Sequence, residues 1–181
     1  MRIVDEVMNL LAGPGREAYL GEQVSQAEHA LQAAWLAERD GAPDSLVISA
    51  LLHDVGHLVL GALEDVAHRG IDAHHEDAGA AWLDKHFGPE VTGPARLHVA
   101  AKRYLCTVES DYFGKLAPDS VRSLKLQGGL MSPDEVETFR RHPQQAEAVR
   151  LRRYDEAAKD PQAATPDFDH FLRHVEACRI Q

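Results

Sequence analysis

The sequence has little cysteine and no long apolar run. Its two cysteines, Cys106 and Cys178, are too few for a disulfide framework and show no CxxC spacing. No stretch approaches the roughly 18 apolar residues of a membrane span. Residues 1–15 contain Asp5 and Glu6 and have no apolar core of the signal-peptide kind. We therefore expect a cytoplasmic protein with no membrane partner.

Basic charge is also scarce. The 181 residues contain 19 Lys and Arg against 29 Asp and Glu, which gives a net charge of -10. Nucleic acids and anionic membranes bind proteins that present a basic face. The acidic net charge therefore argues against both partners and leaves room only for a local basic pocket. Because no linker, repeat or low-complexity run divides the chain, we expect residues 1–181 to form a single domain.

Strand signals are nearly missing as well, since period-two alternation is almost absent and β-branched residues are sparse. Helical spacing, Gly-Pro stops and capping residues instead predict an all-α helical bundle. Asp44 is the expected N-cap of its helix, and Ser132 with Glu135 forms an expected capping box. Residues 58–73 are expected to form a loop or a broken helix. The expected helices are 2–11, 25–40, 45–57, 75–86, 94–106, 108–115, 118–125, 132–140, 142–158 and 166–178.

Histidine, in contrast, is abundant, with 11 residues in the chain. The strongest local pattern is His53-Asp54, at the end of the most hydrophobic expected helix. A polar pair there is costly unless its side chains are paired. An isolated His-Asp pair is most often a solvent-exposed helix end. Here Leu51 and Leu52 before it and Gly56 after it favour burial.

The histidines and two aspartates follow an order that is more specific than any one of them. Imidazole and carboxylate ligands of this number fit a two-metal site for iron, manganese or another borderline divalent ion, with Asp54 able to bridge. The ordered candidates are His29, His53, Asp54, His75, His98 and Asp155.

This set resembles the HD-domain superfamily, whose helical core holds one or two metals with the pattern H…HD…H…H…D. Most members are phosphohydrolases, and a smaller branch consists of mixed-valence di-iron oxygenases. Further segments resemble the phosphonate-cleaving oxygenases of that branch, from about residue 19 to 159. These segments are Tyr19-Leu20-Gly21-Glu22, SQAEH at 25–29, LLHDVGH at 51–57, HEDAGA at 75–80, HVAAKRYL at 98–105, LQGG at 126–129 and RRYDEAAK at 152–159.

The resemblance implies a role for each matching position. The six ordered candidates become ligands of two iron ions in the mixed-valence Fe(II)/Fe(III) state, with O2 as cosubstrate. Tyr19 and His57 are implied as catalytic residues, Tyr19 as a resting-state iron ligand that leaves when substrate arrives. Glu22 is implied to face a cationic nitrogen of the substrate. The implied phosphonate-binding positions are His57, Lys102, Ser120, Gln127 and Arg152.

Physical arguments accompany these assignments. A phosphonate carries up to two negative charges, so Lys102 and Arg152 explain how an acidic protein holds it. Lys102 lies one helical turn after His98 and therefore on the same face. The resemblance implies oxidative C–P cleavage of a 1-hydroxy-2-ammonioethylphosphonate to phosphate and a carboxylic acid. The N-trimethyl form gives glycine betaine and the primary amine gives glycine. The apolar residues 58–60 weakly favour the trimethylated form.

Two other functions stay open from the sequence. A metal-dependent phosphohydrolase of a nucleotide or small phosphate ester would use the same ligands, although Tyr19 would then occupy a position that water needs. A non-catalytic HD-like interaction domain ranks below it, because such a domain is expected to have lost ligands and all six are present. The ligand set alone would also accept manganese.

Overall fold

The computed structural model describes residues 3–17, 23–60 and 74–180. Within these ranges the chain forms helices and no strand, apart from one isolated bridge between Phe87 and Arg179. The all-α prediction is therefore confirmed. The helices are α1 (Ile3–Ala12), α2 (Pro14–Glu17), α3 (Gln26–Arg39), α4 (Asp44–Leu52), α5 (Val55–Val59), α6 (His75–Leu83), α7 (Pro89–Val108), the 3-10 turn η1 (Phe113–Lys115), α8 (Pro118–Leu126), α9 (Pro133–Arg140), α10 (Gln145–Ala157) and α11 (Phe168–Cys178).

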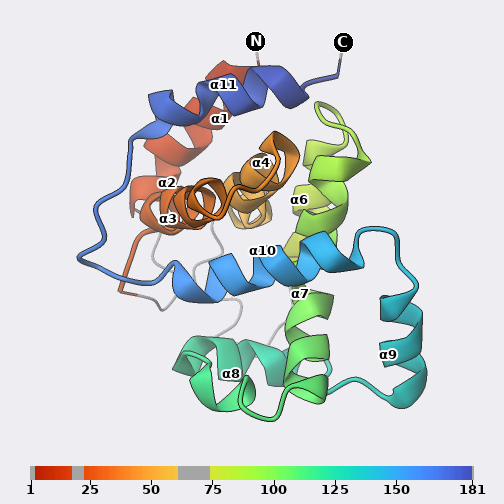
Figure 1. Ribbon diagram of the computed structural model, residues 1–181. Coiled ribbons are helices and arrows are strands. Elements are labelled where there is room, and N and C mark those ends of the chain that lie inside the picture. Colours follow the sequence, from red (N-terminus) through yellow and green to blue (C-terminus); the bar gives the residue numbers. More distant parts are fainter. Residues whose placement is uncertain (1–2, 18–22, 61–73, 181) are drawn as a thin grey trace.

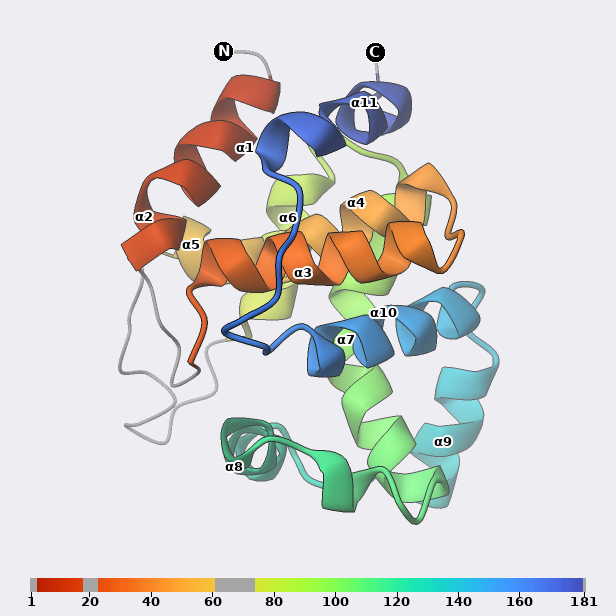
Figure 2. The same cartoon turned by 60° about the vertical axis from the view of Figure 1, so that its left-hand side comes forward.

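The helices are arranged in layers along the molecule. Figures 1 and 2 show α1 and α11 at the end that carries both termini, α3 and α4 in the middle, and α8 and α9 at the opposite end. Helix α10 packs against α3 and α7, and α4 also packs against both of these helices. The long helix α7 runs from the middle layer to the α8–α9 end, as both views show. Helices α3, α4, α7 and α10, which carry or adjoin candidate metal ligands, thus meet in the interior.

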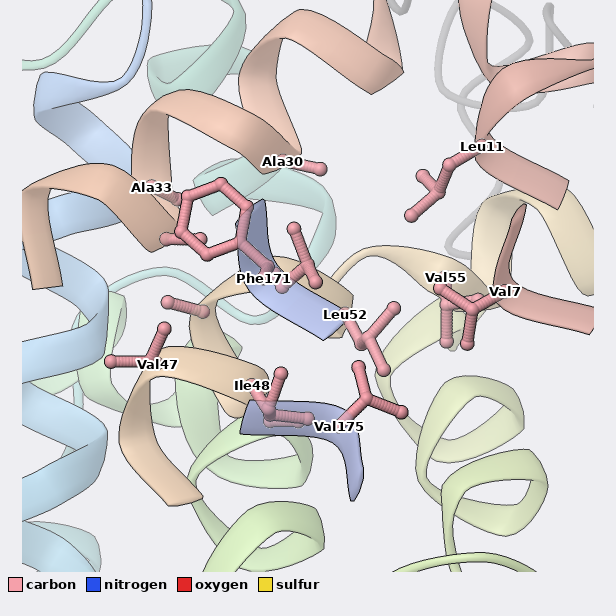
Figure 3. Packing of buried hydrophobic residues seen from close by; sticks show 14 of the residues in the cluster. Val7, Leu11, Ala30, Ala33, Val47, Ile48, Leu52, Val55, Phe171 and Val175 are labelled. Carbon is pink, nitrogen blue, oxygen red and sulfur yellow. The ribbon is translucent and has the colours of Figure 1, made fainter. Parts of the chain in front are cut away.

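The main hydrophobic core lies beside this meeting point. Figure 3 shows Val7, Ile48, Phe171 and Val175 converging from α1, α4 and α11. On α3 the facing positions are small, because the buried residues of that helix include several alanines. Small side chains allow neighbouring helices to approach closely, so the core fixes α3 and α4 against each other. The buried alanines of α3 are Ala27, Ala30, Ala33, Ala34 and Ala37.

The first turn of α3 is set by a capping box. The backbone N–H of Glu28 donates to Ser25 Oγ at 3.3 Å, and the backbone N–H of Ser25 donates to Glu28 Oε2 at 2.7 Å. His29 follows directly, so the cap holds the residue next to the metal-ligand candidate. The expected capping box of Ser132 and Glu135 is also confirmed.

The predicted single helix over 45–57 is wrong. Helix α4 ends at Leu52, and Asp54 has φ -98° and ψ 8°, so α5 begins anew at Val55. The pair His53-Asp54 therefore lies in a break between two helices, where His53 keeps helical backbone angles and Asp54 departs from them. Asp44 is the first residue of α4 rather than its N-cap, because the extended Pro43 occupies the cap.

Two further helix boundaries also differ from expectation. Helix α7 begins at Pro89, after the extended Gly88, so Pro94 lies inside the helix instead of in its first turn. The expected helix over 108–115 is wrong, since α7 ends at Val108 and only η1 follows. Ser110 and Asp111 lie between α7 and η1, where short polar side chains compete with helical hydrogen bonding. Of the expected loop 58–73, residues 61–73 lie outside the described residues.

Helices α5 and α6 touch through two glycines. A Cβ atom at Gly56 would lie 1.9 Å from the carbonyl oxygen of His75 and 2.8 Å from the backbone nitrogen of Gly79. Only a residue without a side chain fits at this position. The close approach holds the start of α6, and with it His75, against the His53-Asp54 break.

Candidate metal centre

Five elements bring the six expected ligands into one place. Helix α3 supplies His29, the break between α4 and α5 supplies His53 and Asp54, α6 begins with His75, α7 carries His98 in its middle, and α10 carries Asp155 near its end. Five of the six residues are buried, and the side chain of Asp54 is 21% exposed. The centre is therefore enclosed by helices and is most accessible at Asp54.

The four imidazoles form two facing pairs. The Nε2 atoms of His29 and His53 lie 3.2 Å apart, and those of His75 and His98 lie 3.1 Å apart. The Asp54 carboxylate lies between the pairs. Its Oδ1 atom is 3.4 Å from His75 Nε2 and 3.5 Å from His98 Nε2, and its Oδ2 atom is 3.8 Å from His29 Nε2. Two groups with metal-ligand spacing result, and they share Asp54.

The opposite ring nitrogens fix which atoms face the centre. The Nδ1 atom of His29 lies 2.9 Å from the carbonyl oxygen of Ala158, that of His53 lies 2.8 Å from Ala50 O, and that of His98 lies 2.6 Å from Ala95 O. A carbonyl oxygen only accepts, so each Nδ1 carries the proton and donates it. In the neutral ring the Nε2 lone pair then points into the centre.

This arrangement fits bound cations. Two neutral imidazoles with protonated Nδ1 atoms have no proton to share between their Nε2 atoms. Without a metal one ring must therefore take up a proton, and against the effect of burial Asp54 and Asp155 raise the pKa of His53 to about 9. A divalent cation between the two rings, with the carboxylates nearby, satisfies both lone pairs. The donor set of nitrogen and carboxylate oxygen suits iron, manganese and similar ions.

Charge in the centre points the same way. Asp155 Oδ1 lies 3.5 Å from His29 Nε2, and its Oδ2 lies 3.8 Å from His53 Nε2. Burial alone raises the pKa of Asp155, but the Arg152 guanidinium and these rings hold it well below its usual range. The pKa of Asp54 is likewise held well below its usual range against burial, chiefly by the charge of His53. Both aspartates are therefore available as anionic ligands.

A second set of polar side chains lies next to the centre. Lys102 and Arg152, buried on α7 and α10, are 4% exposed each. The Arg152 guanidinium donates to Asp155, which connects this set to the metal-ligand candidates. Lys102 Nζ donates to Ser123 Oγ at 2.7 Å. Burial and the nearby charge of Arg152 lower the pKa of Lys102 to about 8. The one-turn spacing from His98 predicted this burial of Lys102.

Ser120 belongs to the same set, and Gln127 lies at the end of the same helix. Arg152 Nη2 donates to Ser120 Oγ at 3.3 Å. Gln127 is the C-cap of α8, one turn after Ser123, and its buried Oε1 atom has no hydrogen-bond partner among the described residues. Gly128 and Gly129 follow with φ of 95° and 69°, values that favour glycine and turn the chain sharply after the helix.

His57 lies in the short helix α5, after the His53-Asp54 break. Because α4 and α5 are separate, His57 does not continue the helical face of His53. Its ring instead stacks on His75, with ring centroids 3.9 Å apart and an interplanar angle of 16°. Burial lowers the pKa of His57 to about 3, and the neighbouring His75 adds to this effect. The neighbouring His74 is 68% exposed and lies outside the two metal-ligand groups.

Tyr19 and Glu22 lie outside the described residues, so their expected roles stay predictions. Sequence reasoning also missed several side chains that surround Arg152. Arg152 Nε donates to the Tyr112 hydroxyl at 3.1 Å, and Arg152 Nη2 donates to Glu156. The spacing of four residues between Arg152 and Glu156 on one helix was the available signal, whereas nothing in the sequence connects Tyr112 to Arg152.

An all-helical fold with a central His-Asp pair and facing histidines defines a metal-binding HD domain. The HD domain family model matches residues 27–108. A [1-hydroxy-2-(trimethylamino)ethyl]phosphonate dioxygenase (glycine-betaine-forming) of Leisingera caerulea is 41% identical over 178 residues, which cover 96% of this chain and 89% of the relative. A hydroxymethylphosphonate dioxygenase of Gimesia maris is 43% identical over 176 residues, covering 97% and 87%. An uncharacterized protein of Acanthamoeba polyphaga mimivirus, L432, is 33% identical over 164 residues, covering 86% and 72%.

The chain therefore belongs to the HD-domain family and, within it, to the group that contains these two phosphonate dioxygenases. This confirms the resemblance that the sequence motifs indicated. None of the described helices is long and apolar enough to cross a membrane.

Proposed function

We propose that this protein uses two iron ions and O2 to cleave the C–P bond of a 1-hydroxyphosphonate. The observation that carries the proposal is the pair of imidazole groups around Asp54 with buried Lys102 and Arg152 beside them. A metal centre next to buried cations suits a substrate with a coordinating hydroxyl at one end and a phosphonate at the other. The names of the two dioxygenase relatives support the same chemistry.

The reaction balances without a further reductant. One R–CH(OH)–PO3H2 and one O2 give one R–COOH and one H3PO4, so the C–P and C–H bonds break while O2 accepts four electrons. Bound iron, in the proposed mixed-valence state, supplies O2 activation and makes the coordinated C1 hydroxyl more acidic. The protein itself would bind the substrate, orient it at the metal centre and exclude water.

The ligand candidates divide this work between two halves of the centre. His29, His53 and Asp155 form one half, and His75 and His98 form the other, with Asp54 proposed to bridge them. Lys102 and Arg152 are proposed to hold the phosphonate, with Ser120 and Gln127 as further polar contacts and His57 at the edge beside His75. Because Arg152 donates to both Asp155 and Ser120, a phosphonate held there would orient the C1 carbon over the centre.

The substrate that we favour is the N-trimethyl form of 1-hydroxy-2-ammonioethylphosphonate, which gives glycine betaine. The name of the Leisingera relative supports it, whereas the apolar residues 58–60 give no structural support, because Leu58 packs in the main core and Val59 and Leu60 are exposed. Glu22 is the proposed counter-charge for the ammonium group. The primary amine, which gives glycine, is the second candidate. The third compound is hydroxymethylphosphonate, from the name of the Gimesia relative. It lacks a cationic nitrogen, so comparing it with the other two tests whether the nitrogen is recognised.

The test is phosphate release from these three compounds by iron-loaded protein, with and without O2. We expect release only with O2, at one O2 consumed per phosphate, and fastest from the trimethylated compound. Glu22→Gln should slow the two ammonium substrates much more than hydroxymethylphosphonate, and equal effects would remove Glu22 from the site. Phosphate release from a phosphate ester without O2, in protein loaded with Mn or Mg, would instead establish a phosphohydrolase.

A further inference from the structure

Besides Lys102 and Arg152, a third basic side chain reaches the proposed phosphonate site. Lys159 directly follows α10, and its side chain is 14% exposed. Its Nζ atom donates to Ser120 Oγ at 2.9 Å, the same hydroxyl that receives Arg152 Nη2 at 3.3 Å. Two cations therefore meet at one small hydroxyl group on α8. Lys102, Arg152 and Lys159 together are called the cation cluster below.

The first half of α8 connects all three members of the cation cluster. Ser120 Oγ contacts Arg152 and Lys159, and Ser123 Oγ accepts from Lys102 Nζ at 2.7 Å. Arg152 also donates to the carboxylates of Asp155 and Glu156, whereas the two serines offer the lysines neutral hydroxyls. A cluster of this kind is suited to an anion that replaces the serine contacts.

Glu156 is the acidic group that organises the cluster. Its carboxylate accepts from Arg152 Nη2, from Ser120 Oγ at 3.0 Å and from the backbone N–H of Ala117 at 2.8 Å. Lys159 Nζ lies 3.5 Å from the same carboxylate. These bonds fix the start of α8 against the end of α10, so the cluster is positioned before a ligand arrives.

The backbone on both sides of Lys159 is also fixed. The carbonyl oxygen of Ala158 accepts from His29 Nδ1 at 2.9 Å. On the other side, the backbone N–H of Asp160 donates to Gln32 Oε1 at 3.1 Å, and Gln32 Nε2 donates to the Asp160 carbonyl oxygen at 2.9 Å. Both contacts come from α3. The backbone of Lys159 is therefore held on both sides by α3, the helix that carries the metal-ligand candidate His29.

We propose that Lys159 is a third substrate-binding cation, which contacts a dianionic phosphonate together with Lys102 and Arg152. The charges support this. Lys159 and Arg152 donate to the Ser120 hydroxyl and Lys102 donates to the Ser123 hydroxyl, so three cationic side chains converge where the phosphonate dianion is proposed to bind.

This inference rests on the proposed function for the identity of the anion, but its test does not require turnover. The probe is inorganic phosphate, which has the same tetrahedral oxygens as a phosphonate. Its dissociation constant is measured by calorimetry on iron-loaded protein without O2. Lys159→Met should raise the constant by at least about tenfold, the effect expected for one charge-assisted hydrogen bond. Lys159→Arg should restore most of the affinity.

The matched control is Lys125→Met, which removes the same charge from the exposed face of α8. It should leave phosphate affinity unchanged, and all variants should keep the wild-type melting temperature. With substrate, Lys159→Met should raise KM by a similar factor and change kcat by less than about twofold, because uniform binding is lost. This separation of KM from kcat is not expected of a residue that only stabilises the helix end.

Two results would overturn the inference. One is unchanged phosphate affinity in Lys159→Met. The other is an equal loss in Lys159→Arg at the wild-type melting temperature, since the charge would then not be what matters. Failure of the O2-dependent cleavage reaction would overturn the proposed function alone, because phosphate binding is measured without it.

Discussion

Gly56→Ala is the most direct test of the connection between helix packing and the metal centre. The added Cβ would lie 1.9 Å from the carbonyl oxygen of His75, whereas ordinary contact begins at 3.4 Å. The start of α6 must therefore move by about 1.5 Å, because the obstacle is backbone and not a flexible side chain. His75 lies at that start, so its imidazole moves with the helix.

The expected magnitudes follow from this displacement. Overpacking costs about 1–3 kcal/mol, and contact with backbone places this site at the upper end. The better helix propensity of alanine offsets at most about 1 kcal/mol, so we expect a net loss of roughly 2 kcal/mol in the free energy of unfolding. Metal-ligand distances tolerate only about 0.2 Å, so the half of the centre formed by His75 and His98 should lose its ion.

The assay is metal content per chain after iron loading, together with urea unfolding of the same samples. Metal content should fall by about half, since the added Cβ atom collides with the backbone of α6, whereas His29 and Asp155 lie on α3 and α10 and His53 caps α4. Gly114→Ala is the matched control, because nothing lies within 4 Å of its added Cβ. Wild-type metal content and stability in Gly56→Ala would refute the proposed coupling of α5 and α6 to the centre.

Three other changes test separate parts of the molecule. Lys102→Ala should weaken phosphonate binding by about 1.5–3 kcal/mol if Lys102 makes a charge-assisted bond, and unaltered affinity would remove it from the site. Tyr19→Phe should change the optical or EPR spectrum of the iron-loaded resting protein, and an identical spectrum would exclude Tyr19 as a ligand. Glu38 accepts from His170 and His174, and these bonds with the neighbouring Arg173 lower its pKa from 4.5 to about 2 although burial raises it. The ionised Glu38 therefore stabilises the fold above pH 4.5, and this contribution disappears as the pH falls towards 2. Glu38→Gln should cost up to about 3 kcal/mol at neutral pH, with a difference from wild type that narrows below pH 4.5 in urea unfolding at successive pH values.

The sequence was sufficient for much of the fold because helical signals are local. Helical spacing predicted α1, α3 and α8 closely, and the Ser132 capping box predicted α9, because such signals act on residues within one turn. The same local reasoning failed at His53-Asp54. The break in the helix comes from packing of α5 on α6 through Gly56 and Gly79, which are far apart in the sequence.

The ordered histidines and aspartates were visible in the sequence by themselves, because metal chemistry restricts residue type and the motifs match a known family. Three features were decided only by the tertiary structure. The Nδ1 bond of His29 fixes the direction of its ring and reaches a carbonyl 129 residues away, whereas His53 and His98 bond to carbonyls three residues earlier in the chain. The stacking of His57 on His75 depends on the angle between two helices.

The third feature is the grouping of Lys159, Glu156 and Tyr112 around Arg152, which depends on where α8 and α10 meet. The contacts of Tyr112 with Arg152 and of Lys159 with Ser120 leave no periodic pattern, because each joins residues from different elements at a distance set by packing. The sequence alone thus determined which side chains are capable of the chemistry. The tertiary structure decided which of them face one another, since only the packed helices set the distances and directions on which coordination and charge pairing depend.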